Sequence, residues 1–404
     1  MVEELMDDRA ICFILFHVLP RMIFWGFFMQ KKQKKRSEMQ DTFYMKQALE
    51  LAGNGMGFVN PNPLVGAVIV KDGQIIGRGW HEYFGGPHAE INAIKDAKGN
   101  TENATIYVSL EPCSHYGKTP PCALEIIRNK FSRVVIGCID PNPLVAGRGI
   151  EVIRNAGIEV QYGIMEKEVK KLNEVFFKFI STQMPFVVMK TAMSLDGKIA
   201  TKNGDSKWIS GEKSRKRVHE LRNQYSGIML GINTVIKDDP LLNVRTINGN
   251  TKNPIRIVVD SKARISLEAK VINSPEIAPT IIAVTDQASD EKIRQLKEKG
   301  VRVIVCPEQN LRVNLRFLMQ ELAKQNIDSI LLESGGTLNF EAMHQGIVDK
   351  VIVFIAPKII GGAEAITPVE GMGVSHLVDA IELENLKTIQ SGQDIMVEGY
   401  LKKK

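Results

Sequence analysis

The chain has 404 residues, of which 44% are hydrophobic and 24% are charged. This composition is typical of a globular protein and excludes an intrinsically disordered chain, and the length suggests two or three domains. The formal net charge is +6, but much of the excess lies in one run, Lys31–Arg36, so the rest of the chain is close to neutral. Aromatic residues make up only 6%, and the composition therefore gives little support to a nucleic-acid-binding protein.

The cysteines are scattered along the chain and odd in number: Cys12, Cys113, Cys122, Cys138 and Cys306. That pattern does not describe a disulfide framework. A reducing cytoplasm is the simpler inference, and cysteines that come together in the fold are to be considered as metal ligands.

The N-terminal segment is apolar from residue 10 to residue 29, but a histidine, a proline and an arginine interrupt it. It is borderline in length for a membrane span, which needs about 20 apolar residues. It is a poor signal peptide, because acidic residues precede it and the lysines follow it. The alternative is that translation starts at Met39 and that residues 1–38 are an extension outside the fold. In both cases we expect the catalytic part of the protein to be cytoplasmic.

From residue 41 the sequence becomes regular, and helices and strands alternate. An amphipathic helix over "TFYMKQALELAGNG" leads into two strands joined by a short turn, and further helices and strands then follow in turn. The expected helices are 42–55, 88–98, 121–129, 150–156 and 166–180, and the expected strands are 64–70, 74–80, 105–110, 133–139 and 158–162. Alternation of this kind predicts a layered α/β domain over residues 39–184.

A second alternating block begins at Pro185 and predicts another α/β domain, over residues 185–404. Val218, Leu221 and Tyr225 give the helix expected at 211–225 one apolar stripe. The expected strands are 186–194, 227–231, 255–260, 281–285, 301–306, 329–334 and 351–357, followed by an edge strand at 395–402.

The stretch "GGPHAEINAIKDAKG" in the first block places a histidine and a glutamate two residues apart at the start of a helix. An H-x-E pair alone is common by chance. However, Cys113 follows Pro112 just past a strand, and Cys122 follows Pro121 at the start of another helix. Helix N-termini lower thiol pKa values and so favour the thiolates that bind metal.

His88, Cys113 and Cys122 make three protein ligands, the number typical of a catalytic zinc with an open fourth position. Glu90 is then free to carry a proton to and from an activated water, as in the zinc nucleobase deaminases, whose pattern is H-x-E followed by P-C-x-x-C. This chain differs in that eight residues, "SHYGKTPP", separate the cysteines. The alternative is that the cysteines are buried apolar residues and that "PHAE" is an ordinary polar helix start.

The motifs "NPNPLVGAVIV", "GWHEYFGGPHAE", "SLEPCSHYGKTPPC", "GCIDPNP", "KTAMSLDGKIA", "WISG", "LLESGGTLN" and "IAPKIIGG" occur in this order from residue 41 onward. In these motifs the chain resembles the bifunctional riboflavin-biosynthesis deaminase–reductases. The resemblance implies that a cytidine-deaminase-like domain, of three α/β/α layers, removes an amino group from a diaminopyrimidinone with a ribosylamino phosphate arm. It also implies that a dihydrofolate-reductase-like domain reduces the ribosyl arm to a ribityl chain with NADPH.

For the deaminase pocket the resemblance adds Asn62, His81, His115, Lys118, Asp140 and Asn142 as substrate contacts. Asn and Asp side chains can read ring edges, and Lys118 and the histidines suit a phosphate or a polarised carbonyl. His81 and His115 could instead be surface loop histidines. Asn62 and Asn142 lie in "PNP" turns, where Asn and Pro favour the turn itself.

The second block has no G-x-G-x-x-G motif, but in "LLESGGTLNFEA" a strand, a glycine pair and a helix start follow one another. The backbone N–H groups of such a turn can hold a diphosphate, although a glycine pair is more often only a turn. The resemblance implies that NADP contacts Ala192, Trp208, Thr234, Asp238, Ser261, Gly335, Gly336, Thr337, Leu338, Asn339, Phe340 and Glu341. It implies that the substrate contacts Ser206, Arg222, Leu242, Arg245 and Glu333.

The two arginines suit phosphate, because a guanidinium forks onto its oxygens, with a solvated surface arginine as the alternative for Arg222. Asp196, in "SLDG", is expected to form a turn. No general acid can be named from the sequence.

Two other classes of protein compete with this interpretation. A nucleic-acid deaminase would need a basic, aromatic-rich surface and would not need the second block. A non-catalytic zinc module would need a fourth ligand and would not use Glu90. Loss of one of the two activities is a further alternative, although the metal-site residues and the "GGTLN" loop are intact. We expect a bifunctional enzyme that binds one Zn²⁺ and NADPH, acts on a small molecule, binds neither nucleic acid nor membrane, and forms a symmetric homo-oligomer.

Overall fold

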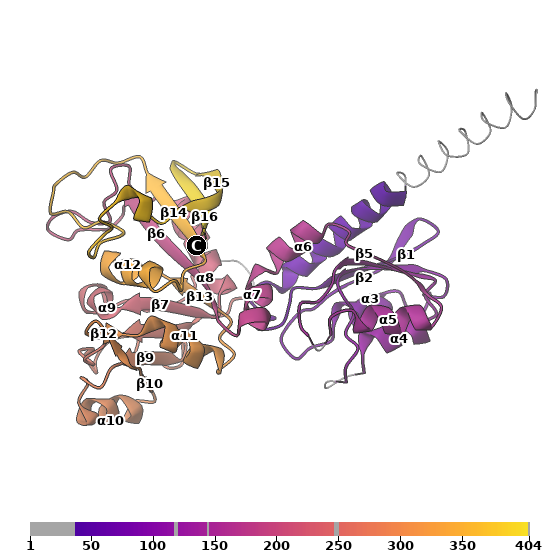
Figure 1. Ribbon diagram of the computed structural model, residues 1–404, viewed down its shortest axis with the longest axis horizontal. Coiled ribbons are helices and arrows are strands. Elements are labelled where there is room, and N and C mark those ends of the chain that lie inside the picture. Colours follow the sequence, from indigo (N-terminus) through magenta and orange to yellow (C-terminus); the bar gives the residue numbers. More distant parts are fainter. Residues whose placement is uncertain (1–36, 117–119, 144, 246–249, 403–404) are drawn as a thin grey trace, which may run out of the picture. The chain divides into compact units, whose positions relative to one another are not determined.

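The computed structural model describes residues 37–116, 120–143, 145–245 and 250–402, and the apolar segment 10–29 lies outside them. The chain forms two compact units (Figure 1). The first holds the described residues of 37–54, Leu64–Glu82 and Gly86–Leu172, and the second holds Gly55–Pro63, Tyr83–Gly85 and the described residues from Asn173 on. The boundary near residue 184 thus stays a prediction. None of the helices described is both long and apolar enough to cross a bilayer.

The first unit is built on a five-stranded sheet in the order β2-β1-β3-β4-β5. Strand β1 runs antiparallel to β2 and β3, whereas β3, β4 and β5 run parallel to one another. The strands are β1 (Gly66–Lys71), β2 (Gln74–Trp80), β3 (Thr105–Leu110), β4 (Arg133–Cys138) and β5 (Glu159–Tyr162). The carboxyl ends of β3 and β4 therefore lie at the same edge of the sheet.

Helices cover both faces of this sheet. Helices α3 (Ala89–Asp96), α4 (Cys122–Arg128) and α5 (Arg148–Asn155) bury Ala93, Ile126 and Ile153 against one face. The helical residues 37–52 and α6 (Glu166–Leu172) cover the other, where Met45 and Val169 both face Gly137 of β4. The predicted three-layer α/β/α architecture is confirmed. A short 3-10 helix, η2 (Gly53–Gly55), follows residue 52.

Two glycines of β2 let α3 lie directly on the sheet. A Cβ atom at Gly79 would come within 2.4 Å of backbone atoms of Ala89 and Ala93, and one at Gly77 within 2.5 Å of the carbonyl oxygen of Ala93. Real Cβ atoms do not approach so closely, so any larger residue here would push the helix away. The glycines thus set the position of the N-terminus of α3, which carries the H-x-E pair.

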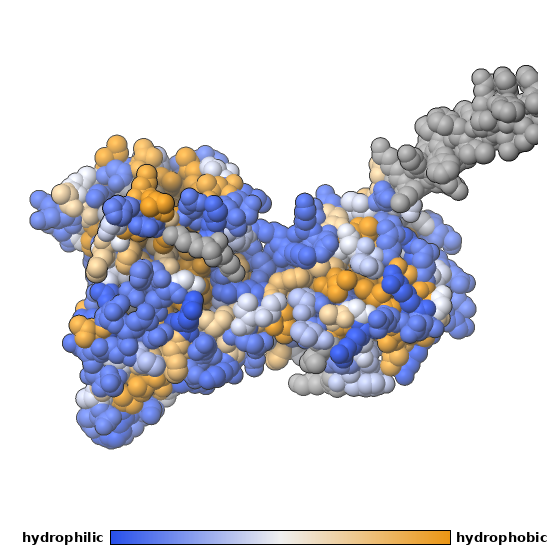
Figure 2. All heavy atoms as spheres, viewed as in Figure 1, coloured by the Kyte–Doolittle hydropathy of each residue, from blue (hydrophilic) through white to orange (hydrophobic). Residues whose placement is uncertain are grey.

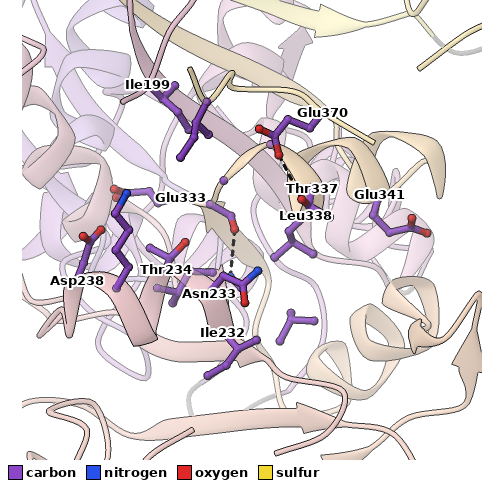
Figure 3. A pocket seen from close by; sticks show the side chains of 18 of the residues that line it. Ile199, Ile232, Asn233, Thr234, Asp238, Glu333, Thr337, Leu338, Glu341 and Glu370 are labelled. Atoms are coloured by element: carbon purple, nitrogen blue, oxygen red, sulfur yellow. Dashed lines mark hydrogen bonds between the residues drawn. The ribbon is translucent and has the colours of Figure 1, made fainter. Parts of the chain in front are cut away.

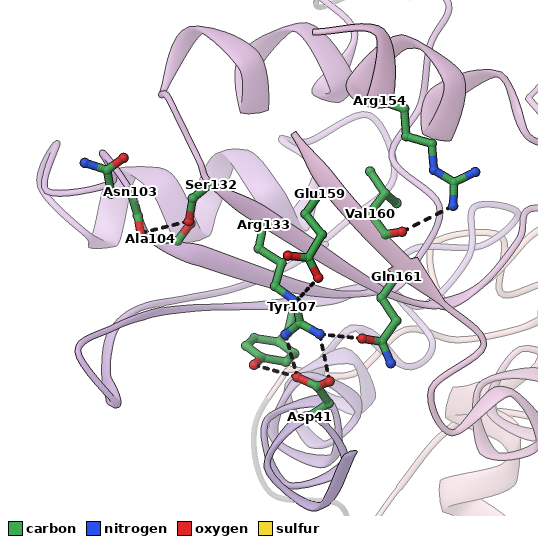
Figure 4. A network of polar contacts seen from close by, with 10 residues as sticks. All are labelled: Asp41, Asn103, Ala104, Tyr107, Ser132, Arg133, Arg154, Glu159, Val160 and Gln161. Atoms are coloured by element: carbon green, nitrogen blue, oxygen red, sulfur yellow. Dashed lines mark hydrogen bonds and ion pairs between the residues drawn. The ribbon is translucent and has the colours of Figure 1, made fainter. Parts of the chain in front are cut away.

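A buried carboxylate ties the first helix to the sheet (Figure 4). Asp41 is 1% exposed and accepts two hydrogen bonds from Arg133, at 2.8 and 2.9 Å, and one from the hydroxyl of Tyr107, at 3.0 Å. Arg133 also donates to Glu159 of β5, at 2.9 Å, and to Gln161. A buried carboxylate is tolerated because a bidentate guanidinium compensates its charge.

The second unit contains a nine-stranded sheet in the order β10-β9-β8-β7-β13-β6-β14-β16-β15. The seven strands from β10 to β14 run parallel, and β16 and β15 are antiparallel. The strands are β6 (Phe186–Ser194), β7 (Gly227–Gly231), β8 (Ile255–Val259), β9 (Thr280–Val284), β10 (Arg302–Val305), β13 (Ser329–Leu332), β14 (Lys350–Ala356), β15 (Leu383–Ser391) and β16 (Asp394–Leu401). Strands β11 (Glu308–Gln309) and β12 (Arg312–Val313) form a separate small hairpin.

Helices cover both faces of this sheet as well. On one face, α11 (Leu315–Ala323) and α12 (Gly336–His344) pack across the strands. On the other lie α8 (Glu212–Gln224), α9 (Ile232–Asp238) and α10 (Asp290–Glu298). The predicted stripe of α8 is confirmed, because Val218, Leu221 and Tyr225 are buried together. The remaining helices are α7 (Glu174–Thr182) and η3 (Leu377–Asp379).

The edge strand was placed wrongly by the sequence pattern. Strand β16 is paired on both sides, and the edge of the sheet is β15, where every residue but Ser391 is exposed. Its polar sequence, "LENLKTIQS", has no alternating apolar face to identify it. The single helix expected at 166–180 is divided at the buried residue Asn173 into α6 and α7.

Candidate functional site

The three expected metal ligands come together in the first unit. His88 is the N-cap residue of α3, Cys113 lies three residues after β3, and Cys122 is the first residue of α4. The Nδ1 atom of His88 is 3.6 Å from the Sγ atom of Cys113 and 3.3 Å from that of Cys122. The ligand atoms all lie within 4.8 Å of one another. Side chains from the start of α3, the start of α4 and the loop after β3 therefore meet at one place.

These distances fit a tetrahedral zinc ion. With Zn–S bonds of about 2.3 Å and a Zn–N bond of about 2.0 Å, neighbouring ligand atoms lie about 3.5 Å apart. The backbone N–H of Cys122 donates to the Sγ atom of Cys113 at 3.3 Å, and this hydrogen bond at a helix start favours a thiolate. Hydrogen bonds from Cys122 and His88 accordingly lower the pKa of the Cys113 thiol.

Glu90 lies beside the ligands in the first turn of α3, but it is not part of the ligand cluster. Its side chain is 3% exposed, and burial raises the pKa of its carboxyl group to about 7, although the nearby His88 works in the opposite direction. A carboxyl group with a pKa near neutral can both accept and release a proton at physiological pH. This is the property required of a proton carrier.

His81 and Asp140 lie close to the site. The ring centre of His81 is 5.5 Å from that of His88, and its Nδ1–H donates to the carbonyl oxygen of Pro87 at 2.9 Å. Burial lowers the pKa of His81, so the ring is neutral at pH 7. Asp140 follows β4 and accepts a hydrogen bond from the backbone N–H of Asn142 at 2.8 Å, and burial raises its pKa to about 6.

Three further deaminase contacts are expected from the resemblance, and the structure describes two of them, His115 and Asn62. His115 is exposed, and Lys118 lies outside the described residues. Asn62 belongs to the segment Gly55–Pro63 of the second unit, so its contact with the substrate stays a prediction.

Sequence reasoning missed Glu111, which holds the metal-site loops in place. The carboxylate of Glu111 is buried and accepts backbone hydrogen bonds from Gly147 at 2.9 Å and Gly149 at 3.0 Å. A Cβ atom at Gly149 would lie 2.1 Å from the carbonyl oxygen of Pro112, so the loop that carries Cys113 packs directly on α5. A weak signal for Glu111 was present in the sequence, because this glutamate stands immediately before Pro112 at the end of a buried strand.

The second unit has a cavity of about 970 Å³ where β6, β7, β8 and β13 end (Figure 3). Ligands of α/β proteins bind at this edge of a parallel sheet. Thirteen of the expected residues line it: Ala192, Ser206, Arg222, Thr234, Asp238, Leu242, Ser261, Glu333, Gly335, Gly336, Thr337, Leu338 and Glu341. The Gly335–Gly336 turn forms the N-terminus of α12, and the hydroxyl of Thr337 donates to Glu370 at 3.3 Å.

A charged cluster lies at one end of the cavity. Arg222 donates to both carboxylate oxygens of Glu333, at 2.8 and 3.0 Å, and Lys190 lies 3.6 Å from the same carboxylate. Burial alone would raise the pKa of Glu333, but the two cations hold it at about 2, so the carboxylate is ionised. A phosphate would have to compete with Glu333 for Arg222, which was expected to clamp the substrate phosphate.

Four expected contacts do not line this cavity. Trp208 and Arg245 line a neighbouring hollow of about 920 Å³, together with Lys213 and Lys216. The amide of Asn339 is buried and donates to backbone carbonyls of the loop around it. Phe340 stacks on the ring of His344 at 5.7 Å.

Lys190 and four further cations of the cavity, Lys237, Lys262, Arg264 and Arg312, were not identified from the sequence. Lys190 stands in the apolar run "FVVMKTAMS", and burial lowers its pKa. A single lysine inside a buried strand is the signal that could have identified it, because lysine is rarely buried without a role.

Comparison with known proteins also divides the chain into two parts. Residues 38–138 match the family "Cytidine and deoxycytidylate deaminase zinc-binding region", and residues 185–397 match the "RibD C-terminal domain". The riboflavin biosynthesis protein RibD of Actinobacillus pleuropneumoniae is 48% identical over 361 residues, which are 89% of this chain and 95% of that protein. RibD of Escherichia coli is 40% identical, over 88% of this chain and 98% of that one.

Solved structures are similar over the same range. RibD of Acinetobacter baumannii superposes with a TM-score of 0.81 at 38% identity, over 91% of this chain and all of that one. A diaminohydroxyphosphoribosylaminopyrimidine deaminase/5-amino-6-(5-phosphoribosylamino)uracil reductase from Thermotoga maritima has a TM-score of 0.79 at 39% identity, with the same coverage. With a deaminase domain and a reductase domain in one chain, this protein belongs to the RibD family of riboflavin biosynthesis enzymes.

Proposed function

We propose that this enzyme hydrolytically deaminates a diaminopyrimidinone that carries a ribosylamino phosphate arm, and then reduces the ribosyl arm to a ribityl chain with NADPH. The observation that carries the first step is Glu90, a buried carboxyl group with a pKa of about 7 beside a three-ligand metal site. The family relationship and the charged cavity of the second unit support the second step.

In the deamination, Glu90 is the group that moves protons. Zinc, when held by His88, Cys113 and Cys122, supplies a Lewis acid that makes a water acidic at neutral pH. The Glu90 carboxylate accepts a proton from the water that attacks the ring carbon. It then returns this proton to the amino nitrogen as the carbon–nitrogen bond breaks, so that ammonia leaves. The neutral His81, with its N–H directed to Pro87, presents its other ring nitrogen as an acceptor.

In the reduction, the second unit must hold a dinucleotide and deliver a proton. NADPH, when bound, supplies the hydride for the arm, and the Gly335–Gly336 turn offers backbone N–H groups for its diphosphate. Reduction of the arm also requires one proton on oxygen or nitrogen. Lys190 is our candidate for its donor, because it is buried in the cavity and burial lowers its pKa.

We further propose that both steps take place in the cytoplasm. Among the described residues, Cys113, Cys122, Cys138 and Cys306 are free thiols, which suits a reducing compartment. The substrate and cofactor are small molecules, and the proposal includes no nucleic acid or membrane partner.

We also propose that the chain associates with a second copy of itself through an apolar face of the second unit. Helices α11 and α12 cover one face of the sheet as far as Val351 of β14. Beyond it the same face continues over Val353, Ile355, Leu383, Leu386, Ile395 and Val397, which we call the apolar face. Leu386 is 59% exposed and Ile395 39%. Figure 2 shows hydrophobic atoms at the surface where Figure 1 labels β14, β15 and β16.

We infer that a second copy of the chain covers the apolar face. One apolar patch is sufficient for a two-fold symmetric dimer, because the same patch meets itself on both subunits. Exposed apolar patches of this kind on a soluble protein typically mark an interaction site.

Zinc binding is expected to weaken as the pH falls. Without metal, the hydrogen bond to Cys113 raises the pKa of His88 to about 9, and Cys113 also raises the pKa of Cys122. Both groups must lose a proton to bind zinc, so the Kd for zinc should rise by up to about 100-fold for each unit by which the pH falls below about 8. Competition with a colorimetric chelator measures the slope. The Cys122→Ala variant should show a shallower slope, Cys138→Ala should match wild type, and a pH-independent Kd would contradict the ligand set.

Glu90→Gln is expected to abolish the first step only. With the diaminopyrimidinone substrate, the variant should consume NADPH about 10²–10⁴-fold more slowly than wild type, because the proton carrier is lost. With the deaminated compound both proteins should react equally, and the zinc content should be unchanged. The control is Glu102→Gln, at an exposed glutamate paired with Lys130. Equal NADPH consumption by wild type and Glu90→Gln with the diamino compound would show that reduction does not require prior deamination.

Lys190→Met is expected to slow the second step. With the deaminated compound, kcat should fall by about 10²–10⁴-fold if Lys190 donates the proton, whereas the Kd for NADP⁺ should stay within about twofold. Lys190→Arg should not restore the rate, because a guanidinium does not release a proton at neutral pH. The control is Lys270→Met, at an exposed lysine beside Asp239. A raised KM with unchanged kcat would instead make Lys190 a binding residue.

Sedimentation velocity tests the proposed self-association. The chain has a mass of 45.0 kDa, and we expect the wild type to sediment as a dimer or a multiple of it. Leu386→Lys and Ile395→Lys place a charge on the apolar face and should shift the protein to monomer. Val305→Lys, at an exposed residue of β10 at the opposite edge of the sheet, should not. A monomeric wild type would rule out the interface.

A further inference from the structure

We propose that Asp196 is a positioning residue of the reduction step, because its carboxylate joins the loop after β6 to the loop after β14 and so holds one wall of the cavity in place. This inference rests on the proposed reductase function and gives Asp196 a part in it beyond the expected turn. The residues that Asp196 contacts in the second loop stand in the motif "IAPKIIGG", for which the proposed function has no use so far.

The carboxylate of Asp196 accepts three hydrogen bonds in the turn that follows β6. Its Oδ1 atom accepts from the hydroxyl of Ser194 at 2.6 Å and from the backbone N–H of Ile360 at 3.0 Å, and its Oδ2 atom accepts from the backbone N–H of Gly361 at 2.7 Å. The hydrogen bonds from Ser194 and from these two backbone groups lower the pKa of the carboxyl group to about 2. Asp196 is therefore ionised, and hydrogen bonds to an ionised acceptor are stronger than those to a neutral one.

The two loops stay paired on both sides of Asp196. The backbone N–H of Leu195 donates to the carbonyl oxygen of Lys358 at 2.8 Å, and the backbone N–H of Ile199 donates to the carbonyl oxygen of Ile366 at 2.8 Å. Ile199 and Ile366 both line the cavity, and Figure 3 labels Ile199 there. The paired loops therefore form one wall of the cavity, and Asp196 lies at the start of this wall.

The loop after β6 extends over the carboxyl end of β13. A Cβ atom at Gly204 would lie 2.5 Å from the Nζ atom of Lys237 in α9, which follows β7, and β13 lies between β6 and β7 in the sheet. Ser206, an expected substrate contact on this loop, lines the cavity. The loop after β14 also holds this end, because the Nζ atom of Lys358 donates to the carbonyl oxygen of Trp208 at 2.5 Å. The position of Ser206 thus depends on the contacts between the two loops.

The glycine turn after β13 has contacts of its own, at the far end of the loop after β14. The backbone N–H of Glu370 donates to the carbonyl oxygen of Gly336 at 3.1 Å, and the hydroxyl of Thr337 donates to the carboxylate of Glu370 (Figure 3). A Cβ atom at Gly336 would lie 2.7 Å from the carbonyl oxygen of Thr367, so the loop packs directly on the turn. These contacts do not involve Asp196, and the turn that suits the diphosphate should keep them when Asp196 is replaced.

The position of the loop after β6 should matter more for the rate of hydride transfer than for the affinity of the cofactor. The reacting atoms have to come within about 3.0–3.5 Å of each other, and a misplacement of about 1 Å can lower the rate about 100-fold. Ser206 and Trp208, the expected contacts of substrate and cofactor, lie on the loop that begins at Asp196. Loss of the carboxylate should therefore lower the rate of the second step and leave the binding of NADP⁺ nearly unchanged.

Kinetics of the full chain with NADPH and the deaminated compound, together with calorimetric titration of NADP⁺, test the inference. Asp196→Ala should lower kcat by about 10- to 100-fold, whereas the Kd for NADP⁺ should stay within about threefold of wild type. Asp196→Asn keeps one oxygen as an acceptor, so its kcat should lie between those of wild type and Asp196→Ala. The matched control is Asp286→Ala, at an exposed aspartate outside the cavity, which should behave as wild type in both measurements.

Hydrogen exchange followed by mass spectrometry reports on the loops without turnover. In Asp196→Ala the amides of Ile360 and Gly361 lose their acceptor and should exchange at least about tenfold faster, with no change in β7 or β13. Unchanged exchange at these amides, an unchanged kcat, or a Kd for NADP⁺ that rises as much as kcat falls would each overturn the inference. Failure of the proposed reductase function has a different signature, namely faster exchange in Asp196→Ala but no NADPH oxidation by wild type.

Discussion

The carboxyl ends of parallel strands determine where both sites lie. In the first unit, β3 ends just before Glu111 and Cys113, and β4 ends just before Asp140. Because parallel neighbours end at one edge, the loops that follow them meet there. Glu111 holds these two loops together, because it accepts backbone hydrogen bonds from the loop after β4. The second unit repeats the arrangement with four parallel strands, and its cavity lies where they end.

The buried carboxylates show which residues the fold leaves available for chemistry. Asp41 is neutralised by Arg133, Glu333 is neutralised by Arg222, and Glu111 is satisfied by backbone N–H groups. These three carboxylates are therefore compensated by the protein itself. Glu90 differs, since among the described residues no lysine or arginine pairs with it, and its burial raises its pKa instead. An incompletely compensated buried acid costs stability, and such residues are typical of catalytic sites.

The sequence was sufficient where the residue types themselves carry the chemistry. His88, Cys113 and Cys122 were predicted together because an imidazole and two thiols, each following a proline, are typical of metal sites, and the buried strands were predicted from their apolar runs. Strand β15 was missed because its apolar residues, Leu383, Leu386 and Ile389, do not alternate with polar ones. The importance of Glu111 was missed because a carboxylate that binds backbone N–H groups has no sequence pattern. Lys190 left a signal, a lone lysine in an apolar strand, whereas Lys262 and Arg264 become recognisable only when the order of the strands places them along one cavity.

The ion pairs of that cavity bear on where an anionic ligand can bind in the second unit. Arg222 and Lys190 share the carboxylate of Glu333, so a ligand phosphate at this end has to exchange with Glu333 or bind in the basic hollow that contains Arg245. Exchange would leave a largely buried carboxylate without its cations, and an unpaired buried charge is costly. The paired cluster therefore disfavours a phosphate at this end of the cavity.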